Sequence, residues 1–432
     1  MSEKIKELLG EGAEVKLAEK RYEVISEILP KVLKGEKPLT RSDLLDKAFL
    51  NKYLGIPIFL ALWWALFRFT FDVSAPLSDL IDMVFGKLGE ISSTYIANEQ
   101  LASFVADGLI GGLGAVLVFI PPIFFLFFGL SILEDSGYLA RAAFVVDRVM
   151  YKLGLHGKSF IPMLLGFGCN IPGIMATRTI DKEEDRILTI LVNPLMSCSA
   201  RLPVYVFIGG AVLGGYAAAG VYSMYILGIV LAVLMALLFR RVIPYFKGKP
   251  SAFILELPMY AMPTLRSTLV HMWERGVLFL KKAGTIILLA TIVIWALSAY
   301  PWEPVHAGSD PDIGASYIGA FGRILEPIFR PLGFDWRAAV ALFFGFVAKE
   351  VVVDTFGVLG LGEAELPQVF TPVTGLAFMA FTLIYIPCLA TIGIIYRETN
   401  SWKWTIFTVI YGLILAYLVA SLIVGIGGLL GY

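Results

Sequence analysis

Charge is scarce in this sequence of 432 residues, since only 16% of them are Asp, Glu, Lys or Arg, against about 25% in soluble domains. Hydrophobic residues make up 58% of the chain, whereas soluble domains carry about 45–50%. This surplus excludes an ordinary soluble core. The 35 basic and 35 acidic residues balance, so the composition gives no sign of nucleic-acid binding.

Cysteine and histidine are also rare. The three cysteines, Cys169, Cys198 and Cys388, lie far apart in apolar segments, which argues against a disulfide framework. The three histidines fall in expected loops or interfaces, so no imidazole is expected inside the membrane segments. The sequence lacks His-Glu-x-x-His and Gly-x-Ser-x-Gly, which disfavours an intramembrane enzyme.

A secretory leader and a phosphate-binding loop are also missing from the sequence. Residues 1–52 are polar and helical in character, so no secretory leader is expected. No Gly-x-x-x-x-Gly-Lys-[Ser/Thr] loop occurs, and the nearest string, at residues 154–159, is two residues too short. We therefore expect no GTP site in this chain.

Apolar blocks of membrane-spanning length, about 17–25 residues, account for most of the sequence. We expect them near residues 53–71, 104–133, 159–178, 187–209, 219–240, 284–300, 338–358, 374–396 and 405–430. The pattern predicts an all-α polytopic membrane protein. Before these blocks, residues 1–40 are rich in Glu and Lys and carry one apolar helical face, which predicts a helical arm.

Two of the blocks differ from ordinary spans. Block 159–178 contains Gly and Pro at several positions, and block 338–358 contains glycines together with Lys349, Glu350 and Asp354. Irregular backbone and charge at membrane depth persist only where protein or a water-filled cavity surrounds them. Both blocks are therefore expected to be broken or re-entrant helices.

The charges of the loops predict the orientation. Lys and Arg are frequent in the arm and recur in the segments 141–158, 178–186 and 240–282, which places these on the cytoplasmic side. Loop 72–100 is acidic, and it is expected outside together with residues 301–337.

A short internal repeat fits this topology. Leu-Gly-Leu-His at 153–156 matches Leu-Gly-Phe-Asp at 332–335, and Gly-Phe at 166–167 matches 345–346 at the same offset. The loop charges give the two copies opposite orientations. Together they predict an inverted repeat, an architecture of secondary transporters with the binding site at the broken helices.

Several longer strings resemble one family. Residues 133–144 (LEDSGYLARAAF), 166–179 (GFGCNIPGIMATRT), 196–201 (MSCSAR) and 348–353 (AKEVVV) look like the membrane domain of FeoB ferrous-iron transporters. The resemblance covers about residues 15–430 and implies two inverted Gate repeats plus one extra amino-terminal span. It also implies ferrous iron (Fe²⁺) as the transported substrate, across the cytoplasmic membrane of a prokaryote with the amino terminus inside.

The resemblance also implies a domain plan. Residues 1–40 would be the tail of a spacer that follows a GTPase domain, 41–100 the first span and outer loop, 101–240 and 284–432 the two Gate repeats, and 241–283 a cytoplasmic linker. The GTPase domain would be a missing segment or a separate chain. Expected partners are that domain, the lipid bilayer, a small cytoplasmic accessory protein and other copies of the chain.

Sulfur ligands are the first candidates for the iron path, since thiolate and thioether groups suit softer metals. Cys169 lies in the Gly/Pro-interrupted block beside Asn170 and Pro172, with Met175 six residues on. Cys198 follows a helix-breaking Pro194, and Cys388 follows Pro387. A buried cysteine can equally be a small inert hydrophobe. The resemblance favours the metal interpretation.

Carboxylates are the second candidates. Glu350 and Asp354 are four residues apart and would share one helix face, so they could bind a cation together, or Lys349 could neutralise one of them. A structural ion pair is the alternative. Glu134 and Asp135 end a span at the expected cytoplasmic mouth, as an exit site or a helix cap. Arg178 and Arg201 are expected to be structural partners of carboxylates or carbonyls.

Two other functions remain as alternatives. A transporter of nucleosides or other organic solutes could use the same repeat, but it would need a polar pocket rich in Asn, Gln and Ser, which are few in these spans. A membrane scaffold without transport would not require a complete inverted repeat with intramembrane charges.

Overall fold

The computed structural model describes residues 20–28, 41–51, 54–96, 98–118, 120–152, 155–247, 260–279, 285–299, 316–362, 364–429 and 431. Of the expected arm, only residues 20–28 are described, and they form an exposed helix. Histidine 306 and parts of the expected linker 241–283 and outer loop 301–337 lie outside the described residues.

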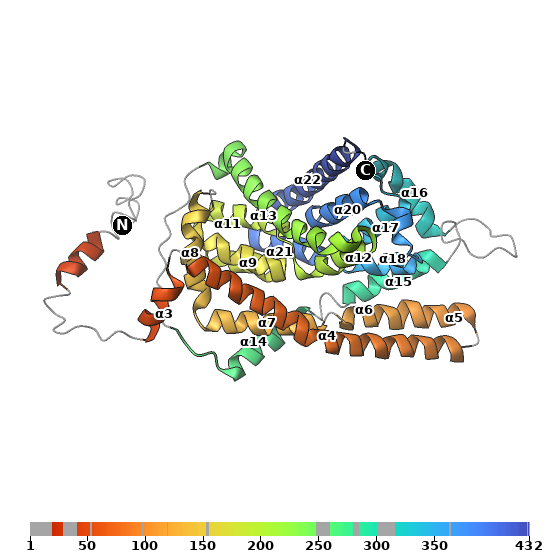
Figure 1. Cartoon of the computed structure of the whole chain (residues 1–432), viewed down its shortest axis with the longest axis horizontal. Helices are drawn as coiled ribbons and strands as arrows, with labels where there is room; N and C mark the ends of the chain where they lie inside the picture. The colour runs from red at the N-terminus through yellow and green to blue at the C-terminus, as the bar shows by residue number, and fades with distance from the viewer. Residues whose placement is uncertain are drawn as a thin grey trace.

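The amino-terminal part is dominated by one long helix. Its elements are α3 (Arg41–Phe49), α4 (Gly55–Tyr95), α5 (Glu99–Ser103), a π-helical stretch η1 (Phe104–Gly111), α6 (Gly112–Val118), α7 (Ile120–Asp135) and α8 (Tyr138–Lys152). The 41 residues of α4 exceed what a bilayer core of about 30 Å requires at 1.5 Å per residue. Figure 1 shows α4 running beyond the rest of the molecule alongside α5 and α6.

This region corrects two expectations. Residues 72–95 were expected in an outer loop but continue α4, and the expected single block 104–133 is divided among η1, α6 and α7. The acidic residues of this segment suggested a loop, yet Val73, Leu77, Leu80 and Val84 recur at spacings of 3 and 4. Contacts of α4 with η1 and α6 stabilise the extension.

The broken helices of the first repeat follow α8. This part of the repeat comprises α9 (Phe160–Gly168), α10 (Asn170–Ala176), α11 (Glu183–Val192), α12 (Leu202–Leu213) and α13 (Ala217–Val242), with short 3-10 turns between them, one of which is at Asn193–Leu195. The prediction of a broken block at 159–178 is confirmed, since α9 and α10 are separate helices. The expected span 187–209 is broken as well, at the Asn193-Pro194 pair.

The second repeat has the same sequence of intact and broken helices. Helix α14 (Leu265–Phe279) lies in the expected linker, and the repeat comprises α15 (Thr285–Ala299), α16 (Tyr317–Phe329), α17 (Trp336–Phe344), α18 (Val351–Val358), α19 (Leu366–Val369), α20 (Pro372–Ile384), α21 (Leu389–Thr399) and α22 (Trp402–Leu429). Turns at 345–350 break the expected block 338–358 into α17 and α18, as predicted. A second break separates α20 from α21, just as α11 is separated from α12.

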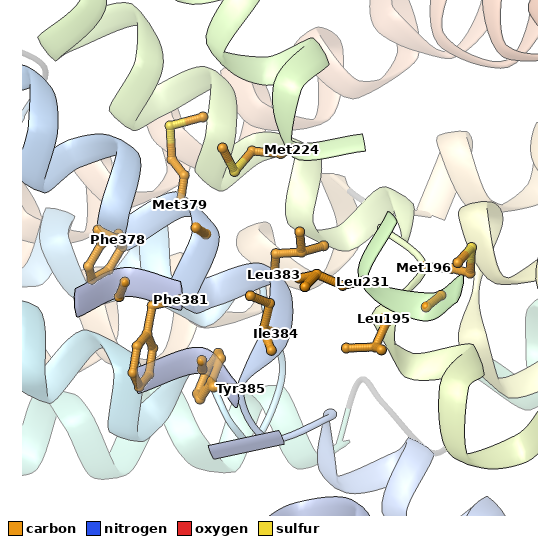
Figure 2. Packing of buried hydrophobic residues seen from close by; sticks show 14 of the residues in the cluster. Leu195, Met196, Met224, Leu231, Phe378, Met379, Phe381, Leu383, Ile384 and Tyr385 are labelled. Carbon is orange, nitrogen blue, oxygen red and sulfur yellow. The ribbon is translucent and has the colours of Figure 1, made fainter. Parts of the chain in front are cut away.

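The two repeats share one apolar core. Leu195, Met196 and Leu231 from the first repeat pack with Phe378, Leu383 and Ile384 from the second in a single buried cluster (Figure 2). Between helices in a bilayer, such packing stabilises the fold mainly through van der Waals contacts rather than by removing apolar surface from water. The repeats therefore form one packed body, and the broken helices lie within it.

The outer surface is apolar where a bilayer would cover it. Along α22, large hydrophobic side chains are exposed at every fourth position: Ile406, Ile410, Ile414, Leu418 and Leu422. Within the described residues, four helical stretches are long and apolar enough to cross a membrane, Gly55–Tyr95, Glu183–Val242, Pro372–Thr399 and Trp402–Leu429. A fifth arises if α7 and the start of α8, bent by 77°, form one span. The chain is thus an all-α, multi-pass membrane protein.

Candidate functional site

Cys169 occupies the break between α9 and α10. Its backbone is extended, with φ −152° and ψ 131°, while the helices on either side are regular. The amide of Cys169 still donates to the carbonyl of Leu165 at 2.9 Å, and its own carbonyl accepts from the amide of Gly173 at 3.3 Å. The break is therefore a single residue wide, and it presents the thiol between two helix ends.

Cys198 occupies the corresponding position after α11. The chain leaves the helix at Asn193 and is extended at Cys198, with φ −76° and ψ 162°. The hydroxyl of Ser199 donates to the carbonyl of Gly168 at 2.8 Å, which joins this break to the break at Cys169. The two sulfur-bearing breaks of the first repeat are thus held side by side.

Cys388 lies in the second repeat, immediately before α21. The amide of Leu389 donates to the carbonyl of Phe346 at 3.1 Å, which joins this segment to the turns between α17 and α18. The Cys388 sulfur lies 3.0 Å from the hydroxyl of Thr391. Glu350 ends those turns and is 7% exposed, so the second repeat brings a thiol and a buried carboxylate together.

These breaks face one cavity of about 80 Å³. That volume has room for several water molecules. Its wall includes all three cysteines, Glu350, Asn170, Lys349 and Arg201. The Asn170 side-chain oxygen is buried without a hydrogen-bond partner among the described residues, so it is available to a guest. The cavity is where the sequence-predicted residues from both repeats meet.

The donors do not form a closed metal site in this conformation. Within the part of the chain that the structure describes, no three His, Cys, Asp or Glu side chains lie close enough together to hold a metal ion. Thiols and one carboxylate instead occupy separate positions around the wall. Such a wall offers a cation successive contacts rather than a permanent cage.

Two buried cations complete the wall. Lys349 donates to the carbonyl of Ile386 at 2.7 Å, and its ammonium lies 3.4 Å from the centre of the Tyr385 ring. Arg201 donates to the carbonyls of Met196 at 2.7 Å and Pro194 at 3.0 Å. Among the described residues, Lys349 forms no ion pair with a carboxylate, so the expected neutralisation of Glu350 or Asp354 by Lys349 is not observed. The expected carbonyl partnership of Arg201 is confirmed.

Other predicted residues lie away from the cavity wall. Met175 and Pro172 belong to α10, but neither lines the cavity. Glu134 is exposed at the end of α7, and Asp135 lies 3.5 Å from the Ser267 hydroxyl on α14. Asp354 follows Glu350 by four residues but does not reach the wall, and its Oδ2 is buried without a partner among the described residues.

Sequence reasoning missed the cavity positions of Arg201, Ser199 and Thr391. Each lies one to three residues after a candidate cysteine, at the start of the helix that follows the break. Polar or charged residues at such positions were the available signal, because the first turn after a break faces the same space as the break itself.

Comparison with protein families places two known domains on this chain. The Gate domain, described as nucleoside recognition, matches residues 116–212 and 280–402. The ferrous iron transport protein B C terminus matches residues 221–275. The two Gate segments contain the two sets of broken helices, α9–α12 and α17–α21.

Curated relatives cover almost the whole chain. It is 49% identical over 428 residues to the "Fe(2+) transporter FeoB" of Methanocaldococcus jannaschii, covering 97% of this chain and 64% of that protein. It is 41% identical to a "Fe(2+) transport protein A/Fe(2+) transporter FeoB fusion protein" of Porphyromonas gingivalis, covering 97% and 56%. The FeoB of Campylobacter jejuni is 39% identical, covering 92% and 67%. The chain thus spans less than two thirds of the first two relatives, and no solved structure matches it significantly.

Proposed function

The chain belongs to the FeoB family of Fe(2+) transporters, and on that premise we propose that it forms the permease core through which Fe²⁺ crosses the cytoplasmic membrane. The observation that carries the proposal is the shared cavity. Cys169 and Cys198 from the first repeat meet Cys388 and Glu350 from the second around one space.

The chemistry of the wall suits Fe²⁺. Ferrous iron accepts both sulfur and oxygen ligands, and the cavity offers three thiols, one carboxylate and the free amide oxygen of Asn170. A transported ion must bind well enough to enter and weakly enough to leave. Donors spread around the wall meet that requirement, because the ion exchanges its water for one or two ligands at a time.

The route is expected to run between the repeats. Segment 178–186, which carries Arg178, Lys182 and Arg186, would lie on the cytoplasmic side together with the amino terminus, because cytoplasmic loops are enriched in Lys and Arg and acidic residues contribute little to orientation. Iron would then leave the cavity toward that face. Met175, Glu134 and Asp135 remain candidate contacts outside the cavity, along the entry or exit.

The partners follow from the family. We expect a GTPase domain to gate this core, and a small accessory protein to act with it, because one relative is a fusion with Fe(2+) transport protein A. Transport of a nucleoside is not favoured. Apart from the cysteines and charged groups, the polar lining residues are Asn170, Ser199 and Thr391, too few for the base and the sugar.

The decisive experiment is Fe²⁺ uptake into sealed proteoliposomes under anaerobic, reducing conditions. If the core alone takes up no Fe²⁺, the GTPase domain of a relative is added as a separate protein. We expect the parent chain to conduct, and Cys169→Ser, Cys198→Ser and Glu350→Gln each to lower the initial rate by about tenfold or more. Glu365→Gln is the matched control, because Glu365 is an exposed carboxylate away from the cavity. Absence of Fe²⁺ uptake together with uptake of a nucleoside would reject the proposal.

A further inference from the structure

Arg201 and Lys349 are the two cations on the cavity wall, and both are almost completely buried. Their exposed fractions are 1% and 2%. A buried charge costs several kcal/mol of desolvation, which hydrogen bonds and partner charges must offset. Among the described residues neither side chain pairs with a carboxylate, so its partners lie elsewhere.

Those partners are main-chain carbonyls freed by the breaks. Arg201 binds the carbonyls of Pro194 and Met196, in the unwound segment that leads to Cys198. Lys349 binds the carbonyl of Ile386, two residues before Cys388. Each repeat therefore has one buried cation that ties down the segment carrying its own cysteine.

The arrangement also decides which ligands a guest can reach. Arg201 and Lys349 line the cavity, whereas Pro194, Met196 and Ile386 do not. The cations thus stand between the cavity and the carbonyls. In other transporters, carbonyls of unwound helices coordinate Na⁺, and carbonyl oxygens are also preferred ligands of Ca²⁺. Here each of these three carbonyls already accepts a hydrogen bond from Arg201 or Lys349, which reduces its capacity to bind a further cation.

We infer that Arg201 and Lys349 are specificity-determining positioning residues, which hold Cys198 and Cys388 at the cavity and exclude hard cations by occupying the carbonyls beside them. This inference rests on the proposed Fe²⁺ function. A cation that binds oxygen only, such as Ca²⁺, meets few free oxygens at the cavity wall. Fe²⁺ still gains the thiols and Glu350, since it accepts sulfur as well as oxygen.

The test uses methionine, which is similar in length but has neither charge nor donor. In proteoliposomes, initial uptake of Fe²⁺ is measured against increasing Ca²⁺, and uptake of Ca²⁺ itself is measured separately. We expect the parent chain to prefer Fe²⁺ strongly, and Arg201→Met and Lys349→Met each to lower the Fe²⁺/Ca²⁺ ratio by about tenfold or more, about 1.4 kcal/mol of selectivity. A ratio has the advantage that it does not depend on the amount of folded protein.

Arg141→Met is the matched control. Arg141 is equally buried, at 2% exposure, but binds Asp46 and the carbonyl of Gly137 away from the cavity. We expect this variant to lose folded protein without a change in the ratio. If Arg201→Met does not fold, Arg201→Lys provides the test. Lysine keeps a positive charge but lacks the rigid planar fork with which Arg201 binds both carbonyls, so an intermediate ratio is expected.

An unchanged Fe²⁺/Ca²⁺ ratio in folded Arg201 and Lys349 variants would overturn the inference while leaving the iron function intact. An equal fall of the ratio in Arg141→Met would overturn it too, since the effect would then be general loosening. Absence of Fe²⁺ uptake by the parent chain is a different result, and it would count against the proposed function itself.

Discussion

Arg178 and Glu398 connect the two repeats through a two-point ion pair. Arg178 Nε donates to Glu398 Oε2 at 2.9 Å and Nη2 donates to Oε1 at 2.5 Å. Arg186 adds a bond to the carbonyl of Glu398 at 2.7 Å. Arg178 follows α10 and Glu398 ends α21, and these two helices also pack together. The pair therefore fixes the far ends of the two helices that begin directly after Cys169 and Cys388.

Arg178→Gln should weaken this junction. The Glu398 side chain is 5% exposed and would keep its charge with fewer donors, so we expect the free energy of unfolding to fall by about 1–3 kcal/mol. The measurement is the thermal midpoint in detergent. Glu23→Gln is the control, because the Lys20–Glu23 pair lies on the exposed helix at residues 20–28 and should contribute less than about 1 kcal/mol. Equal shifts for both variants would contradict the expected role of burial.

Gly173→Ala should disturb the break at Cys169. A Cβ at this position would lie 2.7 Å from the carbonyl oxygen of Pro162 and 3.0 Å from the Asn193 side-chain nitrogen, which itself donates to that carbonyl at 2.7 Å. Since the backbone of α9 cannot yield easily, we expect a loss of about 1–3 kcal/mol of stability together with reduced Fe²⁺ uptake.

Gly393→Ala provides the comparison for that variant. Gly393 is exposed on α21, and a Cβ there would meet nothing within 4 Å. Alanine should then stabilise the helix by up to about 1 kcal/mol and leave uptake unchanged. Tolerance of alanine at position 173 as complete as at position 393 would show that α9 and α10 can separate freely.

His156 should make stability depend on pH. It lies in the connection between α8 and α9, outside the spans, and is 2% exposed. Burial lowers the pKa of His156, although the nearby Asp185 opposes the shift, and its Nδ1 accepts the amide of Lys158 at 3.0 Å. The folded protein therefore binds this proton less readily than the unfolded chain, whose histidines titrate near about 6.5.

Because the pKa of His156 is lower in the folded protein than in the unfolded chain, stability should fall as the pH falls. The contribution of His156 is present above about pH 6.5 and is lost as the pH falls below that value, because only the unfolded chain is then readily protonated. We expect the thermal midpoint to fall between pH 7.5 and about 5.5. His156→Gln, which keeps a side-chain acceptor, should show a smaller fall over the same range. An identical pH profile for the two proteins would assign the acid sensitivity to other groups.

Much of the fold could be predicted from sequence because broken helices leave local marks. Gly166, Pro172 and Gly173 marked the break at Cys169, and Asn193-Pro194 marked the break before Cys198. The length of α4 could not be inferred from charge, because acidic residues occur on exposed helices as well as in loops. Its apolar residues at 3 and 4 spacing were the better guide.

The composition of the cavity was only partly predictable. The cysteines and Glu350 stood out by type and position, whereas the partners of Arg201 and Lys349 depend on carbonyls brought near by tertiary packing. Asp354 shows the limit of helical spacing. The four-residue interval predicted a face shared with Glu350, and the Glu350 backbone is helical, with φ −60° and ψ −36°, yet only Glu350 lines the cavity.

Because Glu350 lines the cavity and Asp354 does not, substitutions of the two acids should affect uptake differently. Glu350→Gln removes the carboxylate of the cavity wall, and we expect Fe²⁺ uptake to fall by about tenfold or more, since bonds to a charged ligand contribute about 1.5–3 kcal/mol. Asp354→Asn removes a charge that lies off the wall and has an unpartnered buried oxygen among the described residues. Uptake should stay within about twofold of the parent, with stability kept or raised. Parallel uptake assays at matched protein content compare the two, and equal losses would mean that the ion visits both carboxylates on its way through the core.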